Sequence, residues 1–445
     1  MAVVGLGASG KAATRFLLAQ GATVLANDSA PASHFGDELR EFSERGAELL
    51  LGRHDAERLS DMDLIVLSPG VPPLAELDIA EEQGVKIVSE VELASWYIKA
   101  PIVAISGTNG KSTVTTLIGN MVKHLMKPVF VGGNLGRPIL DVVGSPAASK
   151  DGLVVVELSS FQLERIESFH PSIAVLTNLS PDHLDRYPSF DAYVAAKARL
   201  FENQTSSNLA VLPAGDSGCL VLSQNGQAKA SFFGSPDGEV RSEGGRVLDT
   251  QTGAFLEHDK IGIKGAHNMT NAACSWLVSR HLGVSPEAIK QSLVSFKGLP
   301  HRMRLVASLR GVDFINDSKA TNVGAAVASI DGLSDSEGRI VLIAGGKHKG
   351  SDYAPLVQSM NRKGRAVVLI GEAAEQMTEA FAASPLVVRR VDSMRQAVVH
   401  ASEIAEAGDT VLLAPACSSY DMFHSYVERG EAFEQAAMGL QKESA

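Results

Sequence analysis

The sequence is poor in cysteine, with only Cys219, Cys274 and Cys417 among 445 residues. They are scattered without CxxC spacing, which excludes a disulfide framework and a cysteine-rich zinc site and is typical of a reducing compartment. Long apolar runs are also missing, since none approaches the roughly 20 residues that span a bilayer. The N-terminal residues 1–7 predict a first strand, not a signal peptide. We therefore expect a soluble cytoplasmic protein without a membrane partner.

Positive charge is in deficit as well: 40 Lys and Arg stand against 51 Asp and Glu, a formal net charge of -11. This balance argues against a nucleic-acid partner, because phosphate contacts along a strand need a basic face. It leaves room for a small anionic ligand held by a few local cations. The length exceeds what one hydrophobic core can organise, so we expect two to four domains.

Short apolar runs alternate with longer amphipathic segments, which is typical of parallel sheets covered by helices. The expected strands form three series, which restart near residues 95–100 and 297–301. The series are 3–7, 22–27 and 63–67; then 102–106, 153–156 and 173–176; then 312–315, 339–344, 366–370, 386–391 and 410–414. Between about residues 218 and 264, short pieces such as Ala230–Phe233 predict small antiparallel hairpins appended to the middle domain. We predict three α/β domains, at 1–97, 98–298 and 299–445.

A glycine-rich segment, GTNGKST (residues 107–113), lies between an apolar strand and an amphipathic helix. A phosphate-binding loop needs this context, because glycines let backbone N–H groups surround phosphate oxygens and a helix N-terminus favours anions. Lys111 would neutralise phosphate charge, and the hydroxyl of Ser112 or Thr113 would bind Mg²⁺. The full Walker spacing requires glycine where this chain has Ile105, so the loop is a shortened variant. The alternative is a glycine-rich turn with an incidental Lys and Ser.

Acidic and imidazole side chains follow two of the expected strands downstream. Glu157 ends the run GLVVVE, and LSPDHLDRY, after the next strand, supplies Asp182, His183 and Asp185. Because the carboxyl ends of parallel strands meet at one edge of a sheet, Glu157 and His183 could reach a metal near the γ-phosphate. Each of them alone could also be an ordinary surface or hydrogen-bonded residue. Lys197 lies on an expected helix, where a surface lysine is the default interpretation.

The first expected strand leads into GLGASG, in which Gly5, Gly7 and Gly10 form G-x-G-x-x-G, with Asp28 further along. Taken alone, this fingerprint favours a dinucleotide cofactor such as NAD, but the same loop can hold other diphosphates. The segment SPGVPP (residues 68–73) follows a strand. It could border the same cleft or form a rigid turn without ligand contact.

Seven motifs in order resemble the Mur ligases: GTNGKST, GGNLGRP, ELSSFQLE, NLSPDHLDRY, AAKARLF, GAHNMTNAA and LPHRM. The resemblance covers nearly the whole chain. It implies an ATP-dependent amide-bond ligase with a Rossmann-like first domain for a UDP substrate, a P-loop central domain for ATP, and a Rossmann-like last domain for an amino acid. The implied cofactors are ATP and two Mg²⁺ ions. Lys197 would be a carbamate at the second ion, because an anion suits a metal site and an ammonium does not.

The resemblance also implies roles for individual residues. ATP would contact Gly107, Thr108, Asn109, Gly110, Lys111, Ser112, Thr113, Asn268, Asn271, Arg302 and Asp317. The metal ions would be held by Ser112, Thr113, Glu157, His183 and Lys197, and catalysis would depend on Lys111, Glu157, His183 and Lys197. The UDP substrate would contact Gly7, Ala8, Ser9, Gly10, Asp28 and Ser29, with Asn134, Ser159 and Gln162 around its acceptor carboxylate.

The motifs of the last domain, NDSKATN and LLAPACSSYDMF, resemble the D-glutamate-adding members of the family. The resemblance implies that D-glutamate is joined to UDP-N-acetylmuramoyl-L-alanine through an acyl phosphate, in cytoplasmic peptidoglycan precursor synthesis. The amino acid would contact Lys319, Thr321, Lys349 and Ser419. Relatives often carry an acidic residue just before the lysine that corresponds to Lys349, where this chain has Lys347 and His348. The added positive charge could suit a dianionic amino acid or be a surface variation.

Three alternatives remain open from the sequence. One is a sister enzyme, either another muramoyl-peptide ligase or a folylpolyglutamate synthetase. Another is an NAD-dependent oxidoreductase, suggested by GLGASG, which leaves the phosphate loop and the metal residues unexplained. The last is a non-catalytic nucleotide-binding protein, although Lys111, Glu157, His183 and Lys197 are all present. Nothing in the sequence requires a partner chain, so we expect a monomer.

Overall fold

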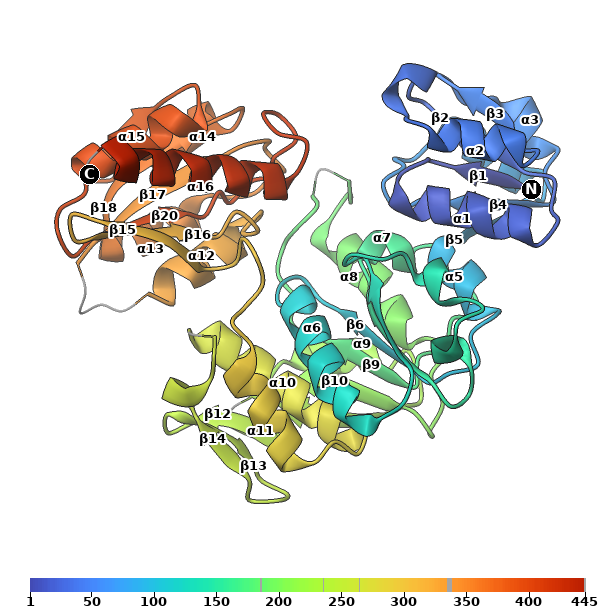
Figure 1. Cartoon of the computed structure of the whole chain (residues 1–445), viewed down its shortest axis with the longest axis horizontal. Helices are drawn as coiled ribbons and strands as arrows, with labels where there is room; N and C mark the ends of the chain where they lie inside the picture. Colours follow the sequence, from blue (N-terminus) through green and yellow to red (C-terminus); the bar gives the residue numbers. More distant parts are fainter. Residues whose placement is uncertain (185, 235, 264, 334–337, 444–445) are drawn as a thin grey trace. The chain divides into compact units, whose positions relative to one another are not determined.

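The computed structural model describes residues 1–184, 186–234, 236–263, 265–333 and 338–443, and contains three sheets (Figure 1). The first sheet is parallel throughout, in the order β3-β2-β1-β4-β5. Its strands are β1 (Ala2–Val4), β2 (Leu25–Asp28), β3 (Glu48–Leu51), β4 (Leu64–Leu67) and β5 (Lys86–Ser89). Between and after them lie α1 (Ala8–Ala19), η1 (Ala32–His34), α2 (Glu38–Glu44), α3 (Ala56–Ser60), α4 (Ala75–Glu82) and α5 (Glu90–Ser95).

The middle sheet has nine strands in the order β14-β13-β12-β11-β10-β9-β6-β8-β7. They are β6 (Ile102–Ser106), β7 (Val129–Gly133), β8 (Leu153–Glu157), β9 (Ile173–Leu176), β10 (Leu209–Pro213), β11 (Lys229–Phe233), β12 (Val240–Glu243), β13 (Arg246–Asp249) and β14 (Phe255–Glu257). Every residue of β6 and β8 is buried, as expected for strands that are covered on both faces.

The helices of this part are α6 (Lys111–Val122), α7 (Ser160–Leu163), α8 (Phe190–Ala198), α9 (Ser217–Ser223), α10 (Ala266–His281) and α11 (Pro286–Ser295). The short 3-10 turns are η2 (Lys123–Leu125), η3 (Ile139–Val142), η4 (Pro146–Ala148), η5 (Arg199–Phe201) and η6 (His258–Lys260).

The third sheet has the order β15-β16-β20-β17-β18-β19, and β15 pairs antiparallel with β16 at its edge. Its strands are β15 (Arg304–Leu309), β16 (Val312–Asn316), β17 (Ile340–Gly345), β18 (Gly364–Ile370), β19 (Val387–Arg390) and β20 (Thr410–Leu413). Its helices are α12 (Val323–Asp331), α13 (Ala354–Lys363), α14 (Ala374–Ala380), α15 (Met394–Ile404) and α16 (Tyr426–Glu443).

Alternation along the strands of this sheet explains why helices cover both of its faces. In β17, Val341 and Ile343 join a cluster with residues of α15 and α16, whereas Leu342 and Ala344 join a cluster with residues of α12 and α13. Figure 1 shows these two helix pairs on opposite sides of the sheet. Successive side chains of a strand point to opposite faces, so an all-apolar strand needs a helical layer on each.

The predicted fold class, three α/β domains with a β appendage on the central one, is confirmed, with one local correction. Ala230–Phe233 is part of a strand, but β11 pairs parallel with β10 and is not half of a hairpin. The antiparallel hairpin is formed instead by β12 and β13, joined by Gly244 and Gly245. Their φ angles of 57° and 74° suit a two-residue turn of the kind that follows the natural strand twist.

The described residues group into two compact units. One comprises residues 1–179, 191–255 and 271–292, and the other 180–190, 256–270 and 293–445. The middle stretch of sequence therefore contributes two short segments to the second unit, and the boundaries at 97/98 and 298/299 stay predictions. Among the helices of the described ranges, none is both long enough and apolar enough to cross a bilayer.

The carboxylate of Glu92, on α5, joins the end of the first domain to the middle one. It accepts hydrogen bonds from the backbone N–H groups of Glu167, Ser168 and Phe169, each at 2.9 Å, and from the Trp96 indole at 2.8 Å. Burial would raise the pKa of Glu92, but the hydrogen bonds, first among them that of the Ser168 hydroxyl, bring it below its ordinary value. Glu92 thus favours the folded state as an anion.

We predict that Glu92→Ala lowers the free energy of unfolding by roughly 3–5 kcal/mol, because it leaves several buried donors without an acceptor. Urea denaturation followed by far-UV circular dichroism measures this. The matched control is Glu81→Ala, which breaks the half-exposed ion pair with Arg165 between the same two parts of the chain. That change should cost about 1 kcal/mol or less. Equal losses in the two variants would contradict a special role for Glu92.

Candidate active site

The glycine-rich turn after β6 is shaped by contacts that leave no room for a side chain. Gly107 has φ 134°, and a Cβ there would lie 2.0 Å from Thr177 Oγ1, at the end of β9. Gly110 has φ 84° and caps α6, and a Cβ on it would lie 2.4 Å from Asn271 Oδ1. These two positions therefore require glycine. The structure brings Asn271, expected near ATP, against the loop.

The turn is held to the end of β9 by two polar side chains. The Thr177 hydroxyl donates to the Asn109 carbonyl at 2.6 Å, and Asn178 accepts from the Asn109 N–H at 2.9 Å. Ser112 and Thr113 follow in the first turn of α6, and both are buried. The loop thus presents a helix N-terminus and two hydroxyls at the carboxyl edge of the sheet, where anionic ligands bind in such folds.

Two lysine side chains converge on this loop. Lys111 Nζ lies 2.9 Å and Lys197 Nζ 2.8 Å from the same carbonyl oxygen, that of Gly107. Lys197 is 1% exposed, so the surface position that its helix suggested is wrong. Its Nζ also lies 4.7 Å from the ring centroid of Tyr193, whose hydroxyl is 3.1 Å from Thr108 Oγ1. Two cations near one turn create a positive site within an acidic protein.

Glu157 ends β8 next to this turn and is 2% exposed. The Asn134 amide, just after β7, donates to its carboxylate at 2.8 Å. Ser159 and Gln162 form a capping box at the start of α7, in which the side-chain oxygen Oε1 of Gln162 accepts from the Ser159 N–H at 3.0 Å. The structure therefore places Asn134, Glu157, Ser159 and Gln162 at adjoining strand ends.

The first glycine loop is equally constrained. A Cβ on Gly10 would lie 1.8 Å from the Gly5 carbonyl oxygen, which accepts from the Ser68 hydroxyl at 2.7 Å. SPGVPP is thus packed against the loop. The Asp28 carboxylate accepts from the Leu6 N–H at 2.6 Å and from the Ala30 N–H at 2.8 Å. Gly7, Ala8 and Ser29 are exposed beside it, and Ser9 is half-buried.

The second unit contains His183, so the three residues expected to share a metal are divided between the units. His183 follows Asp182, whose carboxylate lies 3.4 Å from Lys349 Nζ and 3.1 Å from the Asn322 amide. Asp185 lies outside the described residues. Among the residues that are described, no group of three or more His, Cys, Asp or Glu is arranged to hold a metal.

In the same unit, the charge of Arg302 affects the pKa of both Asp317 and His267. Burial raises the pKa of Asp317, while the Ser329 hydroxyl and the Arg302 charge oppose that shift. Burial and Arg302 lower the pKa of His267. Asn268, in the first turn of α10, is adjacent to His267 in sequence. Arg302, Asp317 and Asn268, all expected near ATP, therefore belong to one unit.

The loops expected to hold the amino acid surround a buried arginine. Arg429, 0% exposed, donates to the carbonyls of Ser318, Cys417 and Ser418 at 2.9–3.1 Å. Burial lowers its pKa to about 10. Arg429 thus ties the loop after β16, which carries Lys319 and Thr321, to the loop after β20, which carries Ser419.

Two further side chains complete this region. Lys319 Nζ lies 3.9 Å from the ring centroid of Tyr426. His348 is 2.8 Å from the Tyr353 hydroxyl through Nδ1, whereas Lys347 is exposed and pairs with Ser418 only through its backbone. The added positive charge of Lys347 therefore lies on the surface.

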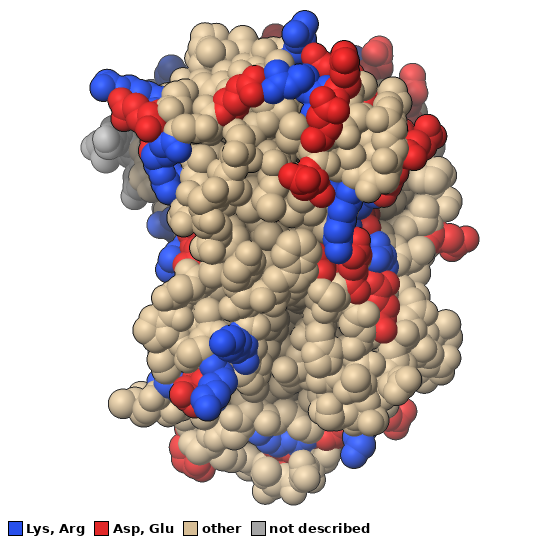
Figure 2. Space-filling model, turned by 90° about the vertical axis from the view of Figure 1, so that its right-hand side faces the viewer, with Lys and Arg blue, Asp and Glu red and all other residues tan. Residues whose placement is uncertain are grey.

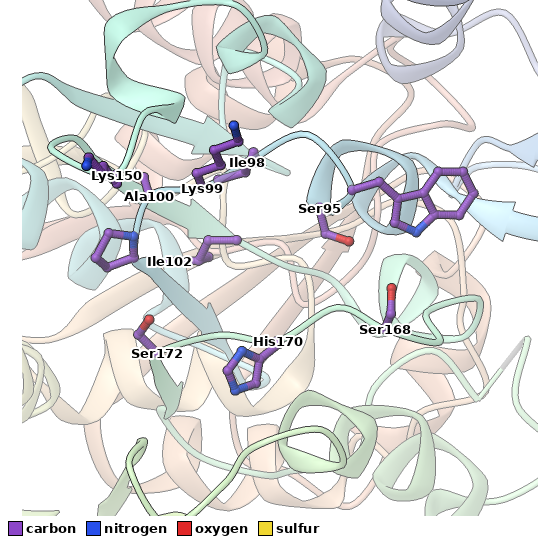
Figure 3. Close-up of a pocket in the computed structure, with 11 residues that line it drawn as sticks. Ser95, Ile98, Lys99, Ala100, Ile102, Lys150, Ser168, His170 and Ser172 are labelled. Carbon is purple, nitrogen blue, oxygen red and sulfur yellow. The ribbon is translucent and has the colours of Figure 1, made fainter.

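A groove of about 470 Å³ lies elsewhere, at the amino end of β6, where Ile102 begins the strand (Figure 3). Lys99, Lys150 and His170 line it together with several serines. It opens at the end of the strand opposite to the glycine-rich turn, so it is separate from the candidate active site.

Figure 2 shows one face of the molecule, on which basic and acidic side chains are interspersed without a continuous basic field.

Three family models match successive stretches of the chain. The Mur ligase MurD-like N-terminal domain matches residues 1–89, the Mur ligase middle domain 105–279, and the Mur ligase glutamate ligase domain 301–417. A protein of Citrifermentans bemidjiense named UDP-N-acetylmuramoylalanine–D-glutamate ligase is 42% identical, over 99% of this chain and 97% of its own length. The chain belongs to the Mur ligase family.

Other relatives of the family extend this result. A Pelotomaculum thermopropionicum protein with the same name is 38% identical over 99% of this chain and 97% of its own. Two Thermotoga maritima structures share the fold. The UDP-N-acetylmuramate–alanine ligase MurC has a TM-score of 0.63 at 19% identity, covering 100% of this chain and 99% of its own. MurF ligase in complex with ADP has a TM-score of 0.65 at 17% identity, covering 95% and 96%.

Several residues of the site are missed by the sequence reasoning. Thr177 and Asn178 could have been found, because a polar pair directly after an apolar parallel strand is a usual position for ligand contacts. Tyr193, Tyr426 and Arg429 could not. They lie on helices at positions that look like ordinary core or surface positions, and only the tertiary fold brings them to the loops.

Glu90, the first residue of α5, is a further buried carboxyl, and it is linked to the first glycine loop through Ser9. It is 1% exposed, and its Oε1 accepts from the Leu140 N–H at 3.1 Å. Burial raises the pKa of Glu90 from 4.5 to about 7, against the effect of hydrogen bonds from Ser9 and Leu140. The folded protein therefore retains a proton that the unfolded chain loses, and stability falls as the pH rises through this interval.

We predict that Glu90→Gln removes this dependence. The variant should match the wild type near pH 4.5 and exceed its stability by roughly 3 kcal/mol at pH 8, because the charged form is no longer buried. Urea unfolding at a series of pH values measures the difference. Glu44→Gln, which changes an exposed residue paired with Arg40, serves as the control and should track the wild type. A constant difference across the pH series would contradict the prediction.

Proposed function

We propose that the protein joins D-glutamate to UDP-N-acetylmuramoyl-L-alanine at the expense of ATP, as a step in making a peptidoglycan precursor. The observation that carries this proposal is the 38–42% identity, over almost the full length, to relatives that are named for this activity. The candidate site supports it, because a phosphate loop, a buried carboxylate and a separate set of amino-acid loops suit a ligase. They do not suit hydride transfer, which needs no phosphate loop of this kind.

In the first half of the proposed reaction, a carboxylate oxygen of the L-alanine unit attacks the γ-phosphorus of ATP. The bond to the ADP oxygen breaks, which gives an acyl phosphate and ADP. Lys111 and the N–H groups around Gly110 would hold the phosphate chain, and Asn271 would lie beside it. Positioning and charge neutralisation account for most of the catalysis in such transfers.

In the second half, the amine of D-glutamate attacks the acyl carbon. The C–N bond forms, the bond to the phosphate oxygen breaks, and the protons of the ammonium group pass to solvent. Water would hydrolyse the acyl phosphate, so a site that excludes water protects this intermediate until the amine attacks. We assign the UDP substrate to residues 1–97, ATP to 98–298 and the amino acid to 299–445.

The oxygen donors near the loop fit Mg²⁺, which prefers carboxylate and hydroxyl ligands. Ser112, Thr113 and the buried Glu157 would hold one ion, and Glu157 and His183 would contribute to a second. Bound Mg²⁺ would neutralise charge on the transferred phosphoryl group. Lys197 as an ammonium cannot bind a metal. Its carbamate could, which would also replace a buried cation by an anion beside Lys111.

The experiment that tests the proposed function is ATP-dependent phosphate release with UDP-N-acetylmuramoyl-L-alanine, comparing D-glutamate with L-glutamate, L-lysine and diaminopimelate. We expect release only when both the nucleotide and D-glutamate are present. Release with another amino acid would assign the chain to a sister enzyme. No release from folded, ATP-binding protein would overturn the proposal.

For Lys197, we predict that Lys197→Ala reduces turnover by a factor of about 100 or more, since it removes both the cation and any carbamate. Millimolar formate or acetate should restore part of the rate to this variant by supplying the missing carboxylate. The control is Lys123→Ala, which changes an exposed lysine at the end of α6 and should leave turnover intact. Near wild-type turnover of Lys197→Ala would remove Lys197 from the site.

A further inference from the structure

Asp182 is the centre of a buried polar cluster in the second unit. Its carboxylate is 8% exposed and lies 3.4 Å from Lys349 Nζ, whose side chain is 12% exposed. The Asn322 amide donates to Oδ2 at 3.1 Å, and the His183 N–H donates to Oδ1 at 2.9 Å. The His183 imidazole approaches the same carboxylate at 3.7 Å. Asp182 is therefore fixed by its neighbours and faces Lys349, one of the two lysines expected to contact the amino acid.

A buried Lys–Asp pair is sensitive to competition for either partner. When a carboxylate of the substrate reaches Lys349, the ammonium of that lysine is shared, and Asp182 loses part of its counter-charge. A buried carboxylate that loses a charged partner is destabilised, so binding a plain carboxylate to Lys349 is penalised. The penalty disappears if the same ligand brings a cation to Asp182.

An amino acid is such a ligand, because its ammonium and carboxylate groups are attached to one carbon. Its ammonium group is complementary to the Asp182 carboxylate, and its carboxylate is complementary to the Lys349 ammonium. We propose that Asp182 binds the ammonium group of the amino-acid substrate while Lys349 binds a carboxylate, so that the zwitterion takes the place of the internal ion pair. This inference rests on the proposed function, since it concerns the substrate of that site.

The proposal explains why Asn322 and the His183 N–H hold the carboxylate of Asp182. Without these hydrogen bonds, the Asp182 side chain could rotate to another conformation when a substrate carboxylate bound Lys349. Asn322 also caps α12, with its side chain accepting from the Ala325 N–H at 2.8 Å. The position of Asp182 is thereby tied to a helix of the third sheet.

The test compares two dicarboxylates of the same length, D-glutamate and glutarate, which lacks the ammonium group. In Asp182→Asn we expect the KM for D-glutamate to rise roughly 30-fold or more, because a buried charge pair is lost. Glutarate, measured as a competitive inhibitor, should bind the variant several-fold more tightly than the wild type, because no carboxylate is left uncompensated. In Lys349→Met, both ligands should bind more weakly.

These opposite signs separate the proposal from a purely supporting role for Asp182. If Asp182 only positions Lys349, Asp182→Asn will weaken D-glutamate and glutarate alike, and that result overturns the inference. An unchanged KM for D-glutamate also overturns it. Glu375→Gln removes an exposed carboxylate of the same unit and should alter neither constant. Thermal unfolding of each variant checks that the fold is retained.

Failure of the proposed function can be distinguished from failure of this inference. Wild-type protein that releases no phosphate with D-glutamate would overturn the proposed function and the inference together. Wild-type protein that is active with D-glutamate, and whose Asp182→Asn variant fails to discriminate between the two ligands in the expected sense, would overturn the inference alone.

Discussion

The organisation of the candidate site depends on the close approach between the turn after β6 and the end of β9. Gly107 contacts Thr177 so closely that only a residue without a side chain fits. The Thr177 hydroxyl, directly after β9, then holds the backbone of the turn. This contact fixes where α6 begins and where the Gly107 carbonyl points. Lys111 and Lys197 reach that carbonyl from two different helices. Without the close approach, neither the loop nor the pair of cations would have a defined geometry.

Much of this arrangement was predictable because it follows from local rules. β6 and β9 lie where continuous apolar runs predict buried parallel strands, at Ile102–Ser106 and Ile173–Leu176. The glycine pattern predicts the turn, and the strand order of parallel sheets predicts that Glu157 lies near it. The apolar pattern does not predict shorter or more polar strands such as β3 and β7, since β3 carries an exposed Glu48 and β7 ends in two glycines. The sequence predicts a strand at Ala230–Phe233 but not its parallel pairing with β10, because register and direction depend on the neighbouring strands.

Buried charged groups account for most of what sequence could not provide. Glu90, Glu92 and Arg429 look like ordinary members of amphipathic helices, yet each is at most 1% exposed. Their partners are largely backbone groups from distant segments: Glu92 binds N–H groups about 75 residues away, and Arg429 binds carbonyls after β16 and β20. Backbone partners leave no trace in residue identity, so no local pattern indicates these contacts. Lys197 is a similar case, recognisable only through family resemblance.

Arg429 has a consequence for how the molecule is made. It belongs to α16, the last helix of the described chain, yet it holds together the two loops that carry Lys319 and Ser419. A growing polypeptide therefore leaves the ribosome with its strands complete before those loops have their common anchor. A chain cut before Arg429 would keep the described strands of the third sheet but lose the side chain that joins the two loops.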